Sequence, residues 1–148
     1  MSILNFTIKL GSKSDELFKL ITDYENLPTF LPDQLKSVEI LEKEDNHTIT
    51  EETLVFTSII KKTITQKTKH SIISNNSLES NVLSGPAKNS KILIKLEEND
   101  EMTKIDVDID LNLDLKTKIF SPLIKKWYKS VLTGIFYKMN TEIINSDD

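Results

Sequence analysis

Residues 104–115 alternate strictly between aliphatic and polar side chains, and this is the strongest pattern in the chain. The aliphatic positions are Ile105, Val107, Ile109, Leu111, Leu113 and Leu115. Successive side chains of a strand point to opposite faces, so the pattern predicts a strand with one apolar and one solvated face. A strand of this length spans roughly 40 Å. Its apolar face therefore needs a long cover.

The segment from Ser121 to about Ile144 is predicted to form a long amphipathic helix that covers this face. Serine suits the cap position and Pro122 the first helical position. At 3.6 residues per turn, apolar side chains fill about half of the circumference. This arc holds Leu123, Gly134, Trp127, Phe120, Val131, Ile124, Ile135, Tyr128, Met139 and Leu132, and the opposite arc holds Lys125, Lys126, Lys129 and Asn140. So wide a stripe predicts a strongly curved sheet wrapped around the helix.

The remaining sequence predicts a first strand, two short helices and a run of hairpins. Met1–Leu10 alternates as a strand, and helical spacing follows up to Tyr24, where nearby prolines limit the second helix. Further strands are expected at residues 38–42, 48–57, 61–73, 78–83 and 90–96, with turn residues between them. Sequential hairpins give an antiparallel meander, with the first strand at an edge. We therefore expect one α+β domain over residues 1–148.

Composition is ordinary for a globular protein, with 38% hydrophobic residues, 28% charged residues and a net charge of −4. Every basic residue is lysine, and the absence of arginine argues against nucleic-acid recognition. Transient contact with a membrane surface or RNA is an alternative use for one lysine group, although a solvated surface is favoured. That group is Lys61, Lys62, Lys67, Lys69, Lys125, Lys126 and Lys129.

The expected location is the cytoplasm. The chain has no cysteine, no apolar run of 18 residues and no basic N-terminal start followed by an apolar stretch.

Side chains for catalysis or metal binding are few. His47 falls in a predicted hairpin turn and is expected to be exposed. His70 stands beside Lys67 and Lys69 and is also expected at the surface. Two such histidines without cysteine make no recognisable zinc site, and the aspartates of residues 106–114 match a solvated sheet face. No nucleotide-binding or serine-hydrolase motif occurs, so no metal or cofactor is predicted. Tyr24 and Tyr128 are candidate hydroxyl groups for an enzyme, or amphipathic core residues.

Several segments together resemble a known family. They are residues 18–30 (FKLITDYENLPTF), 35–41 (LKSVEIL), 84–90 (SGPAKNS) and the closing helix with Trp127 and Tyr128. The chain resembles the START-like (SRPBCC) superfamily with a helix-grip fold, especially the polyketide cyclase/dehydrase and lipid-transport group that includes coenzyme Q-binding proteins. The resemblance implies a seven-stranded antiparallel sheet curved around the C-terminal helix. Two small helices would plug one end, and an elongated apolar cavity would lie between helix and sheet.

By that resemblance, twelve residues are candidates for ligand binding. They are Leu27, Phe30, Leu31, Leu54, Phe56, Ile109, Leu111, Leu113, Trp127, Tyr128, Val131 and Ile135. The alternative, that they pack as solid core, stays open. Gly134 indicates either close packing against a strand or room for a ligand, and Lys138 either extends into water or meets an anionic head group.

Three functions follow from this reading. The first is a non-enzymatic binder or carrier of a hydrophobic small molecule, such as a lipid or isoprenoid, in a cavity of roughly 300–1,000 Å³. The second is a cyclase or dehydratase, which needs an ionisable or phenolic group in the cavity. The third is an interaction module, such as a ribosome-associating protein, which needs an exposed apolar patch. Ligand identity, pathway and oligomeric state lie beyond the sequence.

Overall fold

The computed structural model describes residues 2–56 and 62–146. Its strands are β1 (Ser2–Leu10), β2 (Leu35–Lys43), β3 (His47–Phe56), β4 (Lys62–Ser74), β5 (Ser77–Val82), β6 (Lys91–Asn99) and β7 (Met102–Leu111). Its helices are α1 (Ser14–Ile21), the 3-10 helices η1 (Tyr24–Thr29) and η2 (Lys118–Phe120), and α2 (Ser121–Ser146). Three predicted strand ends, Met1, Thr57 and Lys61, lie outside the described residues.

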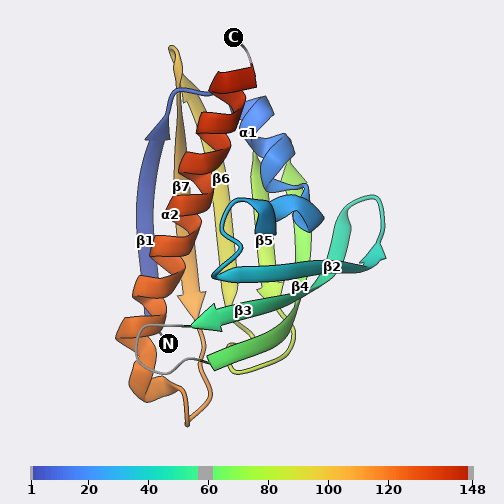
Figure 1. Cartoon of the computed structure of the whole chain (residues 1–148), viewed down its shortest axis with the longest axis vertical. Helices are drawn as coiled ribbons and strands as arrows, with labels where there is room; N and C mark the ends of the chain where they lie inside the picture. Colours follow the sequence, from blue (N-terminus) through green and yellow to red (C-terminus); the bar gives the residue numbers. More distant parts are fainter. Residues whose placement is uncertain (1, 57–61, 147–148) are drawn as a thin grey trace.

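The strands form one antiparallel sheet in the order β1-β7-β6-β5-β4-β3-β2. The predicted meander is confirmed, and β1 pairs with β7 along its whole length, from Ser2 opposite Leu111 to Leu10 opposite Thr103. At the other edge, the β2–β3 register shifts after Leu35 and again after Ile40. Figure 1 shows α2 lying along β1, β7 and β6, while β2 and β3 run crosswise to these strands and extend to one side of α2. The predicted helix-grip architecture is therefore present.

Two periodicities build the core between sheet and helix. Ile105 and Val107 of β7 are fully buried, as the alternation predicts. On α2 the buried side chains recur every three or four residues, which places them on one face. They are Ile124, Tyr128, Val131, Ile135, Phe136, Met139 and Ile143. Phe136 was not placed on the predicted apolar arc, yet it is only 2% exposed.

The long strand is shorter than its alternation predicts. β7 ends at Leu111, and Leu115 is 90% exposed. The partners run out at this point, because β1 begins opposite Leu111 and β6 opposite Asp110. Beyond it, Asp114 accepts hydrogen bonds from Thr117 and turns the chain toward α2.

Asn140 fixes the C-terminal half of α2 to the sheet. Predicted on the solvated arc, it is partly buried, and its Oδ1 accepts hydrogen bonds from the Ser12 backbone N–H at 3.0 Å and the Ser12 hydroxyl at 2.6 Å. Thr103 of β7 in turn donates to the Ser12 carbonyl at 2.6 Å. Gly134 also marks a close approach, although its neighbour is not a strand. A Cβ at Gly134 would lie 2.9 Å from Cδ1 of Leu31, in the segment after η1.

The surface lysines Lys62, Lys67, Lys126 and Lys129 are exposed, which fits a solvated face. Lys61 lies outside the described residues. Lys138 is also exposed and extends into water. Among the described helices, none combines the length and apolar character that crossing a membrane requires.

Candidate functional site

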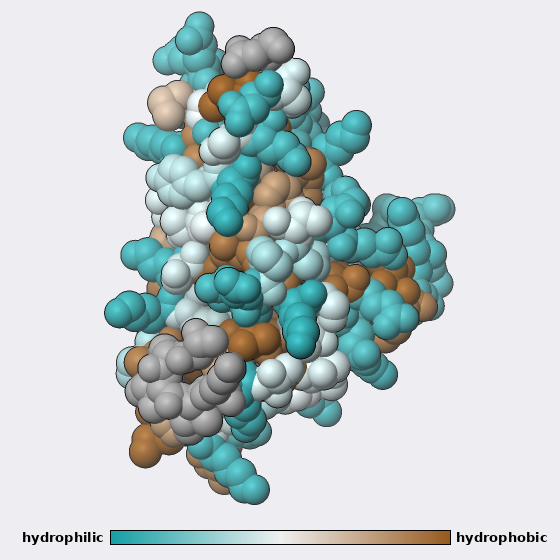
Figure 2. Space-filling model, viewed as in Figure 1, coloured by the Kyte–Doolittle hydropathy of each residue, from teal (hydrophilic) through white to brown (hydrophobic). Residues whose placement is uncertain are grey.

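An apolar cavity of about 140 Å³ lies between α2 and the inner face of β2–β6. Side chains of α1 and η1 close part of its wall. Most of its lining is aliphatic or aromatic: Ile21, Leu27, Leu35, Val38, Leu54, Leu78, Val82, Ile92, Ile94, Trp127, Val131, Leu132, Ile135, Phe136 and Met139. Figure 2 shows hydrophilic side chains around the periphery of this face, with apolar atoms visible between them near the middle, where α2 lies in Figure 1.

The structure brings half of the twelve predicted ligand-binding residues to this cavity. They are Leu27, Leu54, Trp127, Tyr128, Val131 and Ile135. Phe56 and Leu113 instead line a separate space of about 20 Å³. Phe30, Ile109 and Leu111 are buried in the core, and Leu31 packs on Gly134; none of the four is part of the main cavity lining. A binding role for all twelve stays a prediction.

Trp127 is held in a defined orientation at the cavity wall. Its indole N–H donates to the Val55 carbonyl at 3.1 Å, and its ring packs against Phe56 with centroids 4.4 Å apart. Tyr128 meets it edge-on, with centroids 5.2 Å apart. As the only tryptophan in the chain, Trp127 is a unique spectroscopic reporter of the cavity.

One wall of the cavity is polar and centres on Glu52 of β3, which is 8% exposed. Its carboxyl accepts hydrogen bonds from the Thr68 hydroxyl and from the Thr50 hydroxyl at 3.1 Å, and Gln66 also hydrogen-bonds to it. Burial raises the pKa of Glu52 from 4.5 to about 7, because the charged form loses its water. The three side-chain hydrogen bonds oppose this rise without cancelling it.

His70 of β4 joins Glu52 through Thr50. Its Nε2 lies 2.9 Å from the Thr50 hydroxyl, and its Nδ1 lies 2.7 Å from the Ser80 hydroxyl. Burial lowers the pKa of His70 to about 4, so the ring is neutral at pH 7. With Glu52 ionised, Thr50 donates to the carboxylate and therefore accepts from Nε2–H, while Ser80 donates to Nδ1. The four side chains then form one directed chain of hydrogen bonds.

Two tyrosines complete the polar wall. The ring of Tyr24, on η1, stacks on His70 with centroids 4.3 Å apart and planes 16° apart. Burial raises the pKa of Tyr24 to about 12, and that of Tyr128, which is hydrogen-bonded to Gln66, also to about 12. Both therefore stay neutral at pH 7. Both tyrosines are among the residues that line the cavity, as the enzyme alternative requires.

The surface position predicted for His70 is wrong, and the reason is strand parity. On β4, Gln66, Thr68 and His70 share the inner face, whereas Lys67 and Lys69 point to the other side. Glu52 was not predicted as a site residue, again because its position on the inner face was not recognised. It stands two residues before Leu54, a predicted ligand-binding residue, so strand alternation puts both side chains on the same face.

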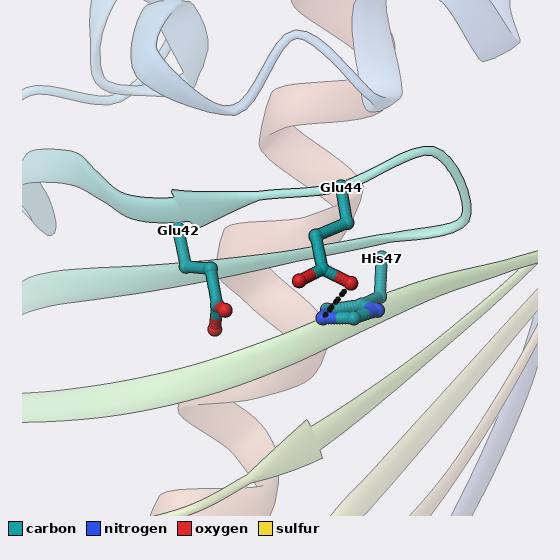
Figure 3. Close-up of side chains that lie close together, drawn as sticks. All are labelled: Glu42, Glu44 and His47. Carbon is teal, nitrogen blue, oxygen red and sulfur yellow. Dashed lines mark ion pairs between the residues drawn. The ribbon is translucent and has the colours of Figure 1, made fainter.

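The only group of possible metal ligands among the described residues lies on the β2–β3 hairpin, away from the cavity. Figure 3 shows Glu42, Glu44 and His47, whose ligand atoms all fall within 4.8 Å of one another. Glu42 and Glu44 are exposed, and His47, predicted to be exposed, is partly buried and pairs with Glu44 at 3.6 Å. This ion pair accounts for two of the three positions, and exposed acidic groups often cluster in this way without an ion. We assign the hairpin no ligand.

A model of the family described as "Polyketide cyclase / dehydrase and lipid transport" matches residues 11–135. No sequence among curated proteins matches the chain.

Solved structures similar to this one share its fold at low sequence identity. A protein from Thermus thermophilus has a TM-score of 0.83 and 12% identity, with 99% of this chain and 100% of that chain covered. A START superfamily protein from Mycobacterium smegmatis has a TM-score of 0.77 and 14% identity, with 97% of each chain covered. An aromatase/cyclase from Streptomyces has a TM-score of 0.76 and 11% identity, with 95% and 92% covered. At these identities the likeness concerns the fold alone.

Proposed function

The chain belongs to the polyketide cyclase/dehydrase and lipid-transport family, and from this premise we propose that it binds a hydrophobic small molecule in the cavity between α2 and β2–β6. The observation that carries the proposal is the cavity itself, whose wall is mostly aliphatic and aromatic. Moving apolar ligand surface from water into such a space is the driving force. With no cysteine in the chain, the reducing cytoplasm is the compartment we favour.

The cavity volume limits what enters without rearrangement. About 140 Å³ is smaller than the roughly 300–1,000 Å³ of a drug-sized site. It is close to the roughly 150 Å³ cavity that holds benzene in an engineered protein. A single ring therefore fits, whereas a lipid or isoprenoid chain requires the cavity to enlarge. Burying six ring carbons yields roughly 5 kcal/mol gross, and the costs of association offset much of it, so a single-ring ligand should bind weakly.

Toluene should bind and shift the indole N–H resonance of Trp127 in a saturable way, because that side chain lines the cavity. Val131→Phe should abolish the shift by filling the space that Val131 now borders. Ser130→Ala, at an exposed position one residue away, is the matched control and should bind as the parent does. Thermal unfolding of each variant establishes that it is folded. A folded parent whose indole resonance does not respond to toluene would contradict the proposal.

Glu52 favours a second function, an enzyme of the cyclase or dehydratase type. A carboxyl with a pKa near 7 inside a cavity is suited to general acid–base catalysis at neutral pH. Its carboxylate would take a proton from the carbon between two carbonyl groups, and the negative charge would pass to the carbonyl oxygens. The neutral hydroxyls of Tyr24 and Tyr128 are the donors available to those oxygens.

Exchange of deuterium into the central carbon of acetylacetone tests this function. If Glu52 is the base, the parent should accelerate exchange, and Glu52→Gln should lower that acceleration by roughly 100-fold or more. Glu51→Gln, on the other face of β3, should exchange at the parent rate. Equal rates in the parent and in Glu52→Gln would leave binding as the sole function.

A further inference from the structure

Among the described residues that line the cavity, one carries a carboxyl group and none is a lysine or arginine. The titratable groups of this lining are Glu52, His70, Tyr24 and Tyr128. An anionic ligand would therefore enter an apolar space without a counter-charge and would face a carboxyl group.

We propose that the bound molecule carries a hydrogen-bond donor, a hydroxyl or a protonated amine, that pairs with the carboxyl of Glu52, and that carboxylate ligands are selected against. This inference rests on the proposed binding function and specifies the class of ligand for the same cavity.

Glu52 supplies the only carboxyl among the described residues that line the cavity. Its two oxygens offer about four lone-pair directions, and Thr68, Thr50, Gln66 and the backbone N–H of Glu52 itself all donate to them. Both ring nitrogens of His70 are paired, and one face of its ring is covered by Tyr24. A ligand donor therefore pairs with Glu52 by sharing an oxygen with one of these protein donors or by displacing it.

Charge at the cavity wall changes at Glu52 near neutral pH. Burial raises its pKa to about 7, whereas the pKa of His70 is lowered to about 4 and those of Tyr24 and Tyr128 are raised to about 12. These are the titratable groups facing Glu52 from β4, η1 and α2. Between pH 6 and pH 8 the wall therefore passes from neutral to singly negative. A cation should bind better at the higher pH and an anion better at the lower pH.

Four compounds of similar shape test the inference: toluene, benzyl alcohol, benzylamine and benzoate. Each is titrated at pH 6 and pH 8, with the Trp127 indole resonance as the readout. Because the ionised fraction of Glu52 rises about tenfold across this interval, benzylamine should bind roughly tenfold more tightly at pH 8, and benzoate roughly tenfold more weakly. Toluene should be insensitive to pH, and benzyl alcohol should bind more tightly than toluene at both pH values.

Glu52→Gln should remove the pH dependence of both charged compounds and weaken benzylamine at pH 8 by roughly tenfold or more, while toluene still binds. Glu51→Gln, whose carboxyl lies outside the cavity lining, should behave as the parent. The inference is overturned if toluene binds but benzoate matches benzylamine at pH 8, or if Glu52→Gln keeps the discrimination. If toluene also fails to bind, the proposed function itself falls, and this inference falls with it.

Discussion

Replacing Glu52 with glutamine should be more stabilising at pH 8 than at low pH. The change in the free energy of unfolding should differ by about 3 kcal/mol between the two conditions. The pKa of Glu52 rises from 4.5 to about 7 on folding, so the folded state disfavours the carboxylate that the unfolded chain readily forms. Glutamine resembles the protonated carboxyl and does not carry this penalty. The gain should shrink below about 1 kcal/mol near pH 5.

The sign follows from proton binding. Between pH 4.5 and pH 7 the folded state binds more protons at Glu52 than the unfolded state, so its contribution to stability falls as pH rises. His70 acts in the opposite direction, because its pKa falls from 6.5 to about 4 and its contribution is lost as pH falls through that interval. The two slopes oppose each other in the parent, and Glu52→Gln exposes the slope of His70.

Urea unfolding of the parent, Glu52→Gln and Glu51→Gln at pH 5, 6, 7 and 8 measures the difference. Glu51→Gln controls for the loss of a negative charge from the same strand on the other face. A Glu52→Gln gain that stays constant from pH 5 to pH 8 would contradict the raised pKa.

Phe136→Ala should lower the free energy of unfolding by about 3–5 kcal/mol. Phe136 is 2% exposed and lies on α2 at the wall of the cavity, so truncation removes buried apolar surface and leaves a larger void. Because the cavity already lies beside this ring, the neighbouring side chains are less able to close the void that truncation leaves.

Tyr137→Ala is the matched control, because Tyr137 is the next residue on α2 and is 51% exposed. It should cost under about 1 kcal/mol in the same urea titration. If both variants lose the same stability, the loss reflects the helix in general and the packing role of Phe136 is wrong. An enlarged cavity should also accept a two-ring compound such as naphthalene more tightly than the parent does.

The fold was predictable because two periodicities extend over long segments. Alternation from Ile105 to Leu111 gives the strand one apolar and one polar face, and helical spacing from Ile124 to Met139 does the same for the helix. The two apolar faces are buried by packing against each other. The excess length assigned to β7 has a different origin. Leu113 and Leu115 continue the alternation, but a strand also needs neighbours to pair with, and those end opposite Leu111 and Asp110.

The candidate site was predictable only in part, since periodicity gives the face of a residue and not the presence of a void. Ile109 and Leu54 both face inward, yet only Leu54 reaches the cavity, because the space lies over β2–β6. Its volume depends on how every side chain packs, and no local pattern contains that information. The polar wall was within reach of parity alone, but Glu52 and His70 stand in polar surroundings that resemble a solvated face.

The two register shifts in β2 bear on how this protein behaves at high concentration. β2 is an edge strand, and an unpaired edge is a template for addition of a strand from another molecule. Irregularities after Leu35 and Ile40 interrupt the straight row of donors and acceptors, and the exposed side chains of Lys36, Glu39 and Glu42 stand along the same strand. This edge therefore resists intermolecular sheet extension, which protects the protein from aggregation through β2.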